Sequence, residues 1–146
     1  MTKIIYASIL IALLLFGCKN DDESLSPEQL NTLKWTKTWS LGANGHVLVD
    51  GQDITSDYSG FEITFESTGD SKIYQVHNGQ KAFPVAIDTW NFTDETYTSI
   101  VRGSDGVIIA GEINENTLLL NLSIPIPNGR VEGTYGNFEF MLETED

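Results

Sequence analysis

The chain has 146 residues, enough for one domain, and its three Trp, five Tyr and seven Phe can build a packed core. The formal net charge of −13 arises from 21 acidic and 8 basic residues, which excludes phosphate binding by clustered Lys and Arg, so we expect no nucleic-acid partner. The same balance excludes attachment to anionic lipid headgroups through surface charge, so any membrane attachment must be hydrophobic or covalent.

Residues 1–17 have the layout of a secretory signal peptide. Lys3 gives a positive start, residues 4–16 carry no charge, and Gly17 is small. The alternative is a transmembrane anchor, but a membrane span needs about 20 apolar residues. We therefore expect residues 1–17 to be removed.

Cys18 is the single cysteine of the chain and follows this segment directly. The stretch Leu15-Phe16-Gly17-Cys18 resembles the bacterial lipobox, in which a peptidase cuts before a cysteine whose thiol carries a diacylglycerol. The alternative is a free cysteine near an ordinary cleavage site, but such sites prefer a small residue where this chain has Leu15. A lone thiol cannot form an intrachain disulfide. We therefore expect the protein to be attached to a membrane through a covalent lipid on Cys18.

Residues 18–25 form the predicted tether. The run Lys19-Asn-Asp-Asp-Glu23 is a solvated charged linker on the simplest interpretation. It also resembles the lysine-plus-acidic export signal that follows the lipidated cysteine in surface lipoproteins of the Bacteroidetes. That resemblance implies a cell-envelope protein attached to the outer membrane, with display on the outer face as the finer expectation.

A short helix is predicted at residues 24–34. Ser26 is a suitable N-cap, Pro27 suits the first helical position, and Leu30 and Leu33 share one face. We expect this helix to pack on one end of the domain.

Alternation of apolar and polar residues predicts about eight antiparallel strands in the rest of the chain. Between the first two strands, residues 42–60 form a longer polar excursion with a short strand at 46–49. Asn78-Gly79 and Asp105-Gly106 are turn signals, and Gly133 and Gly136 indicate a bulge or bend. Short hairpins favour an up-and-down barrel over a sandwich. The strand ranges are 35–41, 61–66, 72–77, 90–92, 97–102, 107–113, 117–124 and 130–142.

The pattern resembles the small lipocalin-like lipoproteins of Bacteroidetes. The matching features are Trp39 after a short helix, the strand at 60–65, Trp90-Asn-Phe92 and the closing segments 130–133 and 136–140. The resemblance covers residues 25–143 and implies an all-β, lipocalin-like barrel over residues 26–146, after a short N-terminal helix. We expect a monomer.

One part of the lipocalin pattern is absent, because Lys37 stands where the Gly of Gly-x-Trp would precede Trp39. In lipocalins an arginine late in the chain closes the barrel end over this tryptophan. The resemblance assigns that role to Arg130, and Arg102 is the only other arginine.

The sequence offers little for catalysis or metal binding. His46 and His77 are the only histidines, and we expect both at the surface. The acidic loop 50–57 is a polar loop or, alternatively, a weak calcium site, although its spacing does not match an EF-hand. Five glutamates are expected on strand exteriors, so we expect neither an enzyme nor a cofactor nor a metal: Glu62, Glu66, Glu112, Glu132 and Glu139.

Nine aromatic residues are the candidate ligand-lining or core set: Trp39, Phe61, Phe65, Tyr74, Trp90, Phe92, Tyr97, Phe138 and Phe140. They either fill the barrel or surround a small apolar or amphipathic ligand. Two further functions remain open, a surface module for a glycan or protein and a structural envelope protein without a ligand. The surface module predicts exposed aromatics such as Trp35 or Tyr58.

Overall fold

The computed structural model describes residues 24–79, 82–125 and 135–144. The predicted signal peptide, Cys18, Arg130, Glu132 and Gly133 lie outside these residues. The elements are α1 (Pro27–Trp35), β1 (Thr38–Ser40), β2 (His46–Val49), β3 (Gln52–Asp53), the 3-10 helix η1 (Thr55–Tyr58), β4 (Glu62–Thr68), β5 (Ser71–His77), β6 (Ile87–Phe92), β7 (Ser99–Arg102), β8 (Ile108–Asn114), β9 (Thr117–Ile124) and β10 (Gly136–Glu143).

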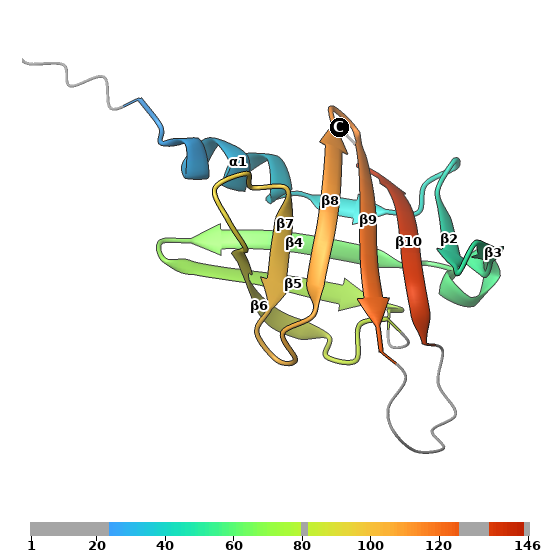
Figure 1. Cartoon of the computed structure of the whole chain (residues 1–146). Helices are drawn as coiled ribbons and strands as arrows, with labels where there is room; N and C mark the ends of the chain where they lie inside the picture. The colour runs from blue at the N-terminus through green and yellow to red at the C-terminus, as the bar shows by residue number, and fades with distance from the viewer. Residues whose placement is uncertain (1–23, 80–81, 126–134, 145–146) are drawn as a thin grey trace, which may run out of the picture.

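Strands β1 and β4 to β10 form a closed, eight-stranded antiparallel barrel with one short α-helix, which confirms the predicted fold class (Figure 1). Each strand from β4 to β10 pairs with its neighbour in the chain, as in a meander. The barrel closes where β1 pairs with both β4 and β10, through Ser40 opposite Glu143. Closure removes the exposed sheet edges that would otherwise invite aggregation.

The predicted short strand at 46–49 is confirmed as β2, which extends the barrel wall beyond β1. Both β1 and β2 run antiparallel to β10, so residues 41–45 interrupt what is in effect one wall strand. β3 then pairs with the outer edge of β2.

The antiparallel order gives the barrel two different ends. The end that we call the α1 end carries the helix and the connections between β4 and β5, β6 and β7, and β8 and β9. The opposite end, which we call the loop end, carries the longer segment 41–61 and the connections at 78–86 and 103–107.

Helix α1 begins as predicted. Ser26 Oγ accepts a hydrogen bond from the Gln29 amide (3.2 Å) while Gln29 Oε1 accepts one from the Ser26 amide (2.7 Å), and Pro27 occupies the first turn. This reciprocal capping box satisfies two amides that the helix itself cannot.

The prediction that Trp35 begins the first strand is wrong, because Trp35 is the last residue of α1 and points into the barrel. Its ring lies 5.3 Å from Phe65 and 6.0 Å from Trp90, and its Nε1 donates to the Tyr97 carbonyl (3.2 Å). A Cβ on Gly111 of β8 would collide with the same ring. Trp35 therefore closes the α1 end. Period-two alternation predicted the wrong element for Trp35, because a tryptophan at the end of a helix can fill the same core volume as an inward-facing strand residue.

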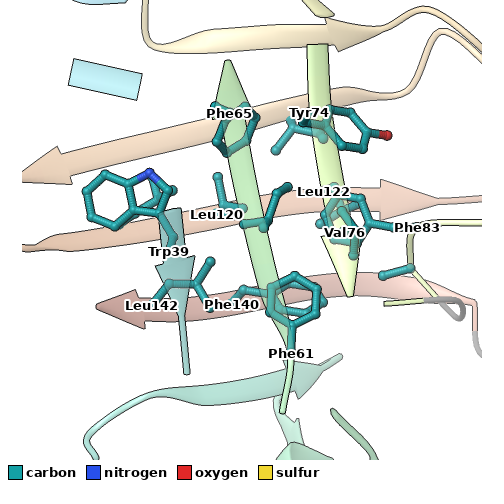
Figure 2. Packing of buried hydrophobic residues seen from close by; sticks show 14 of the residues in the cluster. Trp39, Phe61, Phe65, Tyr74, Val76, Phe83, Leu120, Leu122, Phe140 and Leu142 are labelled. Atoms are coloured by element: carbon teal, nitrogen blue, oxygen red, sulfur yellow. The ribbon is translucent and has the colours of Figure 1, made fainter. Parts of the chain in front are cut away.

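Inside the barrel, alternate residues of each strand face the core (Figure 2). On β9, Leu118, Leu120 and Leu122 are buried, and on β10, Phe138 and Phe140 are buried. The predicted exterior glutamates Glu62, Glu66, Glu112 and Glu139 fall on the opposite faces and are exposed or half-buried.

The hairpin predicted at Asn78-Gly79 is wrong, although the turn at Asp105-Gly106 is present. Asn78 does take a left-handed conformation (φ 57°), but its Nδ2 donates to the Gly60 carbonyl (2.9 Å) and β6 begins only at Ile87. The intervening residues include Ala82 and Phe83, which are buried in the barrel. Burial of this apolar pair outweighs the local preference of Asn-Gly for a two-residue turn.

The Trp35 closure gives a first prediction. Gly111→Ala places a methyl group against the Trp35 ring and should lower the free energy of unfolding by about 1–3 kcal/mol, as overpacking does. Urea unfolding measures this. Ala110→Val, on the exposed face of the same strand, is the control and should change stability by less than about 0.5 kcal/mol. Equal stability of wild type and Gly111→Ala would contradict the tight packing of Trp35.

Candidate functional site in the barrel interior

The candidate aromatic residues gather inside the barrel. Phe92 and Tyr97 are only partly buried and lie at the α1 end. The other seven are at most 1% exposed: Trp39, Phe61, Phe65, Tyr74, Trp90, Phe138 and Phe140.

Six of the nine candidate rings, together with those of Tyr58 and Phe83, form a continuous chain of contacts from one end of the barrel to the other, which we call the aromatic column. At these separations neighbouring rings pack edge to face or tilted, so the column fills the barrel axis. Successive centroids lie 5.1 Å apart for Tyr97–Phe92, 5.3 Å for Phe92–Trp90, 5.8 Å for Trp90–Phe65, 5.9 Å for Phe65–Tyr74, 5.9 Å for Tyr74–Phe83, 5.7 Å for Phe83–Phe140 and 5.2 Å for Phe140–Tyr58.

Three members of this packing were not in the candidate set: Trp35, Tyr58 and Phe83. Trp35 and Tyr58 were expected at the surface if the protein were a surface-binding module, and that expectation is wrong, because each is only 1% exposed. Phe83 follows a polar turn and precedes Pro84. The signal that could have predicted the burial of Phe83 is an isolated apolar pair inside a polar loop. Leaving such a pair in water costs free energy, so it tends to turn inward.

At the loop end, two separate segments each insert one aromatic ring into the mouth of the barrel. Tyr58 comes from η1, and Phe83 comes from the connection between β5 and β6. Phe140 lies 5.2 Å from the Tyr58 ring and 5.7 Å from the Phe83 ring, and Phe61 contacts both as well. We call Tyr58 and Phe83 the aromatic plug (Phe83 is labelled in Figure 2).

The Tyr58 hydroxyl is buried and has no hydrogen-bond partner among the residues that the structure describes. Burial raises the pKa of Tyr58 to about 12; the Asp57 carboxylate adds to this, while the nearby Ala82 amide opposes it without reaching hydrogen-bond geometry. Leaving a buried hydroxyl unpaired costs about 1–3 kcal/mol. The plug therefore holds an unused polar group inside an apolar mouth.

Arg102 holds the Phe83 side of the plug in place. Its side chain is 1% exposed, its Nη1 donates to the Ala82 carbonyl (2.7 Å), and its guanidinium lies 5.5 Å from the centre of the Phe83 ring. Asp105 binds the same guanidinium through two hydrogen bonds, at 3.0 Å from Nε and 2.6 Å from Nη2. Such bidentate pairing fixes the plane of the guanidinium.

Arg130, to which the resemblance assigned the arginine closure, lies outside the described residues. The other arginine, Arg102, is buried at the loop end, where its guanidinium lies over Phe83. Among the described residues, the cation over Trp39 is Lys37, whose Nζ lies 5.7 Å from the ring centre.

The other polar candidates lie on the outside of the barrel. His46 Nε2 lies 3.2 Å from Glu139 Oε1, and both side chains are more than a third exposed, while His77 is exposed. In the acidic loop, Asp50 accepts hydrogen bonds from Asn137, and Asp53 accepts one from the Thr55 amide (2.8 Å). These carboxylates thus stabilise the loop conformation.

The described part of the chain offers neither a metal-binding cluster nor a membrane-spanning helix. Across residues 24–79, 82–125 and 135–144, no three His, Cys, Asp or Glu side chains group closely enough to hold a metal ion. Over the same ranges, no helix has the length and apolar character needed to cross a membrane.

The Arg102–Asp105 pair predicts a pH dependence. Burial alone would raise the pKa of Asp105, but the hydrogen bonds from Arg102 and the Val107 amide, with the Arg102 charge, hold it below its ordinary value. A lowered folded-state pKa means that the pair stabilises the fold at neutral pH and that this contribution is lost as the pH falls below about 4. Asp105→Asn should therefore be about 3 kcal/mol less stable than wild type at pH 7, with the difference shrinking below about pH 4.

Thermal unfolding of both proteins from neutral to acidic pH measures this difference. Asp70→Asn, at the exposed turn between β4 and β5, is the control, with an expected change within about 0.5 kcal/mol. A constant difference between wild type and Asp105→Asn at every pH would show that the carboxylate charge is not the cause.

Comparisons of the chain with protein-family models, with curated proteins and with solved structures found no match. The closed eight-stranded barrel is compatible with the lipocalin-like fold that the sequence resembles.

Proposed function

We propose that the protein is a lipid-anchored cell-envelope protein that binds a small apolar or amphipathic ligand at the loop end of its barrel. The ligand takes the space that the aromatic plug occupies in the unliganded state. Tyr58 and Phe83 move outward with their loops, and the apolar wall below them, including Phe61 and Phe140, receives the ligand. The protein binds and does not catalyse, and it acts as a monomer.

The observation that supports this proposal most directly is the construction of the plug. A barrel that served only as a solid scaffold would gain nothing from an unpaired hydroxyl in its mouth, because such a group costs stability. A ligand with a polar group at one end offers that hydroxyl a partner while its apolar part replaces the plug rings. Eight-stranded barrels have room for side chains or for one small ligand.

The anchor and location in this proposal rest on the sequence. A diacylglycerol on Cys18 with a further acyl chain gives stable attachment, since each buried CH₂ contributes about 0.8 kcal/mol. The acidic tether resembles the export signal of outer-membrane surface lipoproteins, which supports a location outside the cytoplasm.

Phe83→Ala tests whether the aromatic plug opens to admit a ligand. Removal of a buried Phe costs the closed state about 3–5 kcal/mol, so the open population should rise by at least about tenfold. The association rate of a neutral fluorescent probe, N-phenyl-1-naphthylamine, should rise accordingly in stopped-flow measurements. Phe92→Ala, which removes a ring at the α1 end, is the matched control and should leave the rate near that of wild type.

Organic extraction of gently purified protein, followed by mass spectrometry, examines the natural ligand. The proposal expects a small apolar or amphipathic molecule in stoichiometric amount. An empty extract, together with no probe binding to either Phe83→Ala or wild type, would overturn it in favour of a solid barrel.

Tyr58→Phe separates a functional hydroxyl from a structural one. Without the unpaired group, the unliganded protein should become more stable by about 1 kcal/mol, because the desolvation cost disappears. Affinity for the extracted ligand should fall, because its polar end loses its partner. Unfolding and binding titrations of the same preparation measure the two changes. A loss of stability in Tyr58→Phe would mean that the hydroxyl is already paired.

A further inference from the structure

Helix α1 turns an apolar face away from the barrel. Trp35 points inward, and at 100° per residue Leu30 and Leu33 fall on nearly the opposite side of the helix. These two leucines are 50% and 58% exposed, and Leu25, just before the helix, is 47% exposed. Among the described residues, six large apolar side chains are exposed, and half of them lie on or beside α1. These are Leu25, Leu30 and Leu33; the other three are Val85, Ile87 and Ile108.

The position of this face along the chain indicates what covers it. Seven residue steps separate Cys18 from Leu25, so even a fully extended chain reaches at most about 25 Å. If Cys18 carries the lipid, as the proposed function holds, the α1 end must stay within that distance of the bilayer. The loop end is on the far side of the barrel.

Helix α1 carries two charged side chains, Glu28 and Lys34. Lys72 Nζ from β5 pairs with Glu28 (2.7 Å), and Lys34 Nζ donates to the Asn31 side-chain oxygen (3.2 Å), which leaves the Lys34 charge in place. Beside the helix, a groove of about 680 Å³ runs to the turn between β4 and β5, with Leu25 and Leu33 on its helical side. Polar side chains such as Ser26 and Thr32 line most of the rest, as suits a surface that meets headgroups.

We infer that α1 is a membrane-docking surface: Leu25, Leu30 and Leu33 insert among the lipids of the leaflet that holds the Cys18 anchor. Docking orients the barrel with its α1 end on the bilayer and its plugged loop end toward the solvent. The contact is apolar, so it should persist at high salt, which abolishes long-range attraction between charges. This inference rests on the proposed acylation of Cys18.

The test uses the full chain, expressed in a bacterium that acylates lipobox cysteines and reconstituted in phosphatidylcholine vesicles. An introduced cysteine is then the single free thiol and carries an environment-sensitive bimane label. Leu33→Cys reports the docking face, and Ile108→Cys at the loop end is the matched control, because the two residues are 58% and 57% exposed. Nitroxide-labelled lipid should quench the label at residue 33 and leave the label at residue 108 unquenched.

A second pair of variants tests the leucines themselves. Leu25→Ser with Leu30→Ser, in the Leu33→Cys protein, should lower the equilibrium constant for docking on the order of fivefold for each leucine, since each is about half-exposed before insertion. Val85→Ser with Ile87→Ser is the control and should leave the quenching unchanged. All four positions are exposed, so the fold should be retained.

The outcomes separate docking from anchoring. An acylated Cys18 in the intact mass of the purified protein supports the anchor, whereas an unmodified Cys18 overturns it. Co-sedimentation of Cys18→Ser does not decide this, because the docking leucines themselves bind lipid. Anchored protein without lipid quenching at residue 33 overturns docking alone. A label at residue 33 that is shielded from both lipid and aqueous quenchers also overturns it, because a second copy of the chain or another protein then covers the face.

Discussion

The structure depends on the filling of a closed barrel from both ends by aromatic side chains. The interior of an eight-stranded barrel is just wide enough for inward-facing side chains to fill it. The side chains on the barrel axis therefore determine how the wall strands pack around them. Trp35 enters from the helix, Tyr58 and Phe83 enter from the loops, and the aromatic column connects them. Because each plugging residue belongs to a connection and not to a wall strand, the same contacts that fill the core also hold the connections in place.

The two ends are nevertheless built differently. At the α1 end, Trp35 is fixed by its hydrogen bond to Tyr97 and by the bare backbone of Gly111, so little can move without breaking the helix. At the loop end, a buried arginine contacts the Ala82 carbonyl and the Phe83 ring, and the Phe83 amide donates to the Gly79 carbonyl (2.6 Å). Both plug rings come from connecting segments and not from paired strands, and such segments open at a lower free-energy cost than the strands around them. This asymmetry is why the proposed binding site is at the loop end.

The sequence predicted the wall of the barrel better than its ends. Strands such as β9 and β10 alternate strictly, and seven of the nine candidate aromatics are buried in the interior. Trp35, Tyr58 and Phe83 were misplaced or missed because their burial depends on how the connections fold back, which has no sequence period. Asn78-Gly79 shows the same limit, since its hairpin preference was overridden by the burial of Phe83. Local patterns report which face of a strand is apolar and do not report which loop covers an open end.

Anchoring and binding make compatible demands on this fold. A ligand that reaches the barrel from the solvent would need the plugged end to be free, and the proposed lipid on Cys18 would hold the α1 end near the bilayer through a short tether. The exposed leucines of α1 lie on the side of the helix opposite Trp35, so their contact with lipid leaves the Trp35 packing unchanged. Membrane contact at one end and loop opening at the other therefore involve separate residues. In the proposed arrangement the Trp35 end faces the bilayer, and the end that Arg102 contacts faces the solvent, from which a ligand would enter.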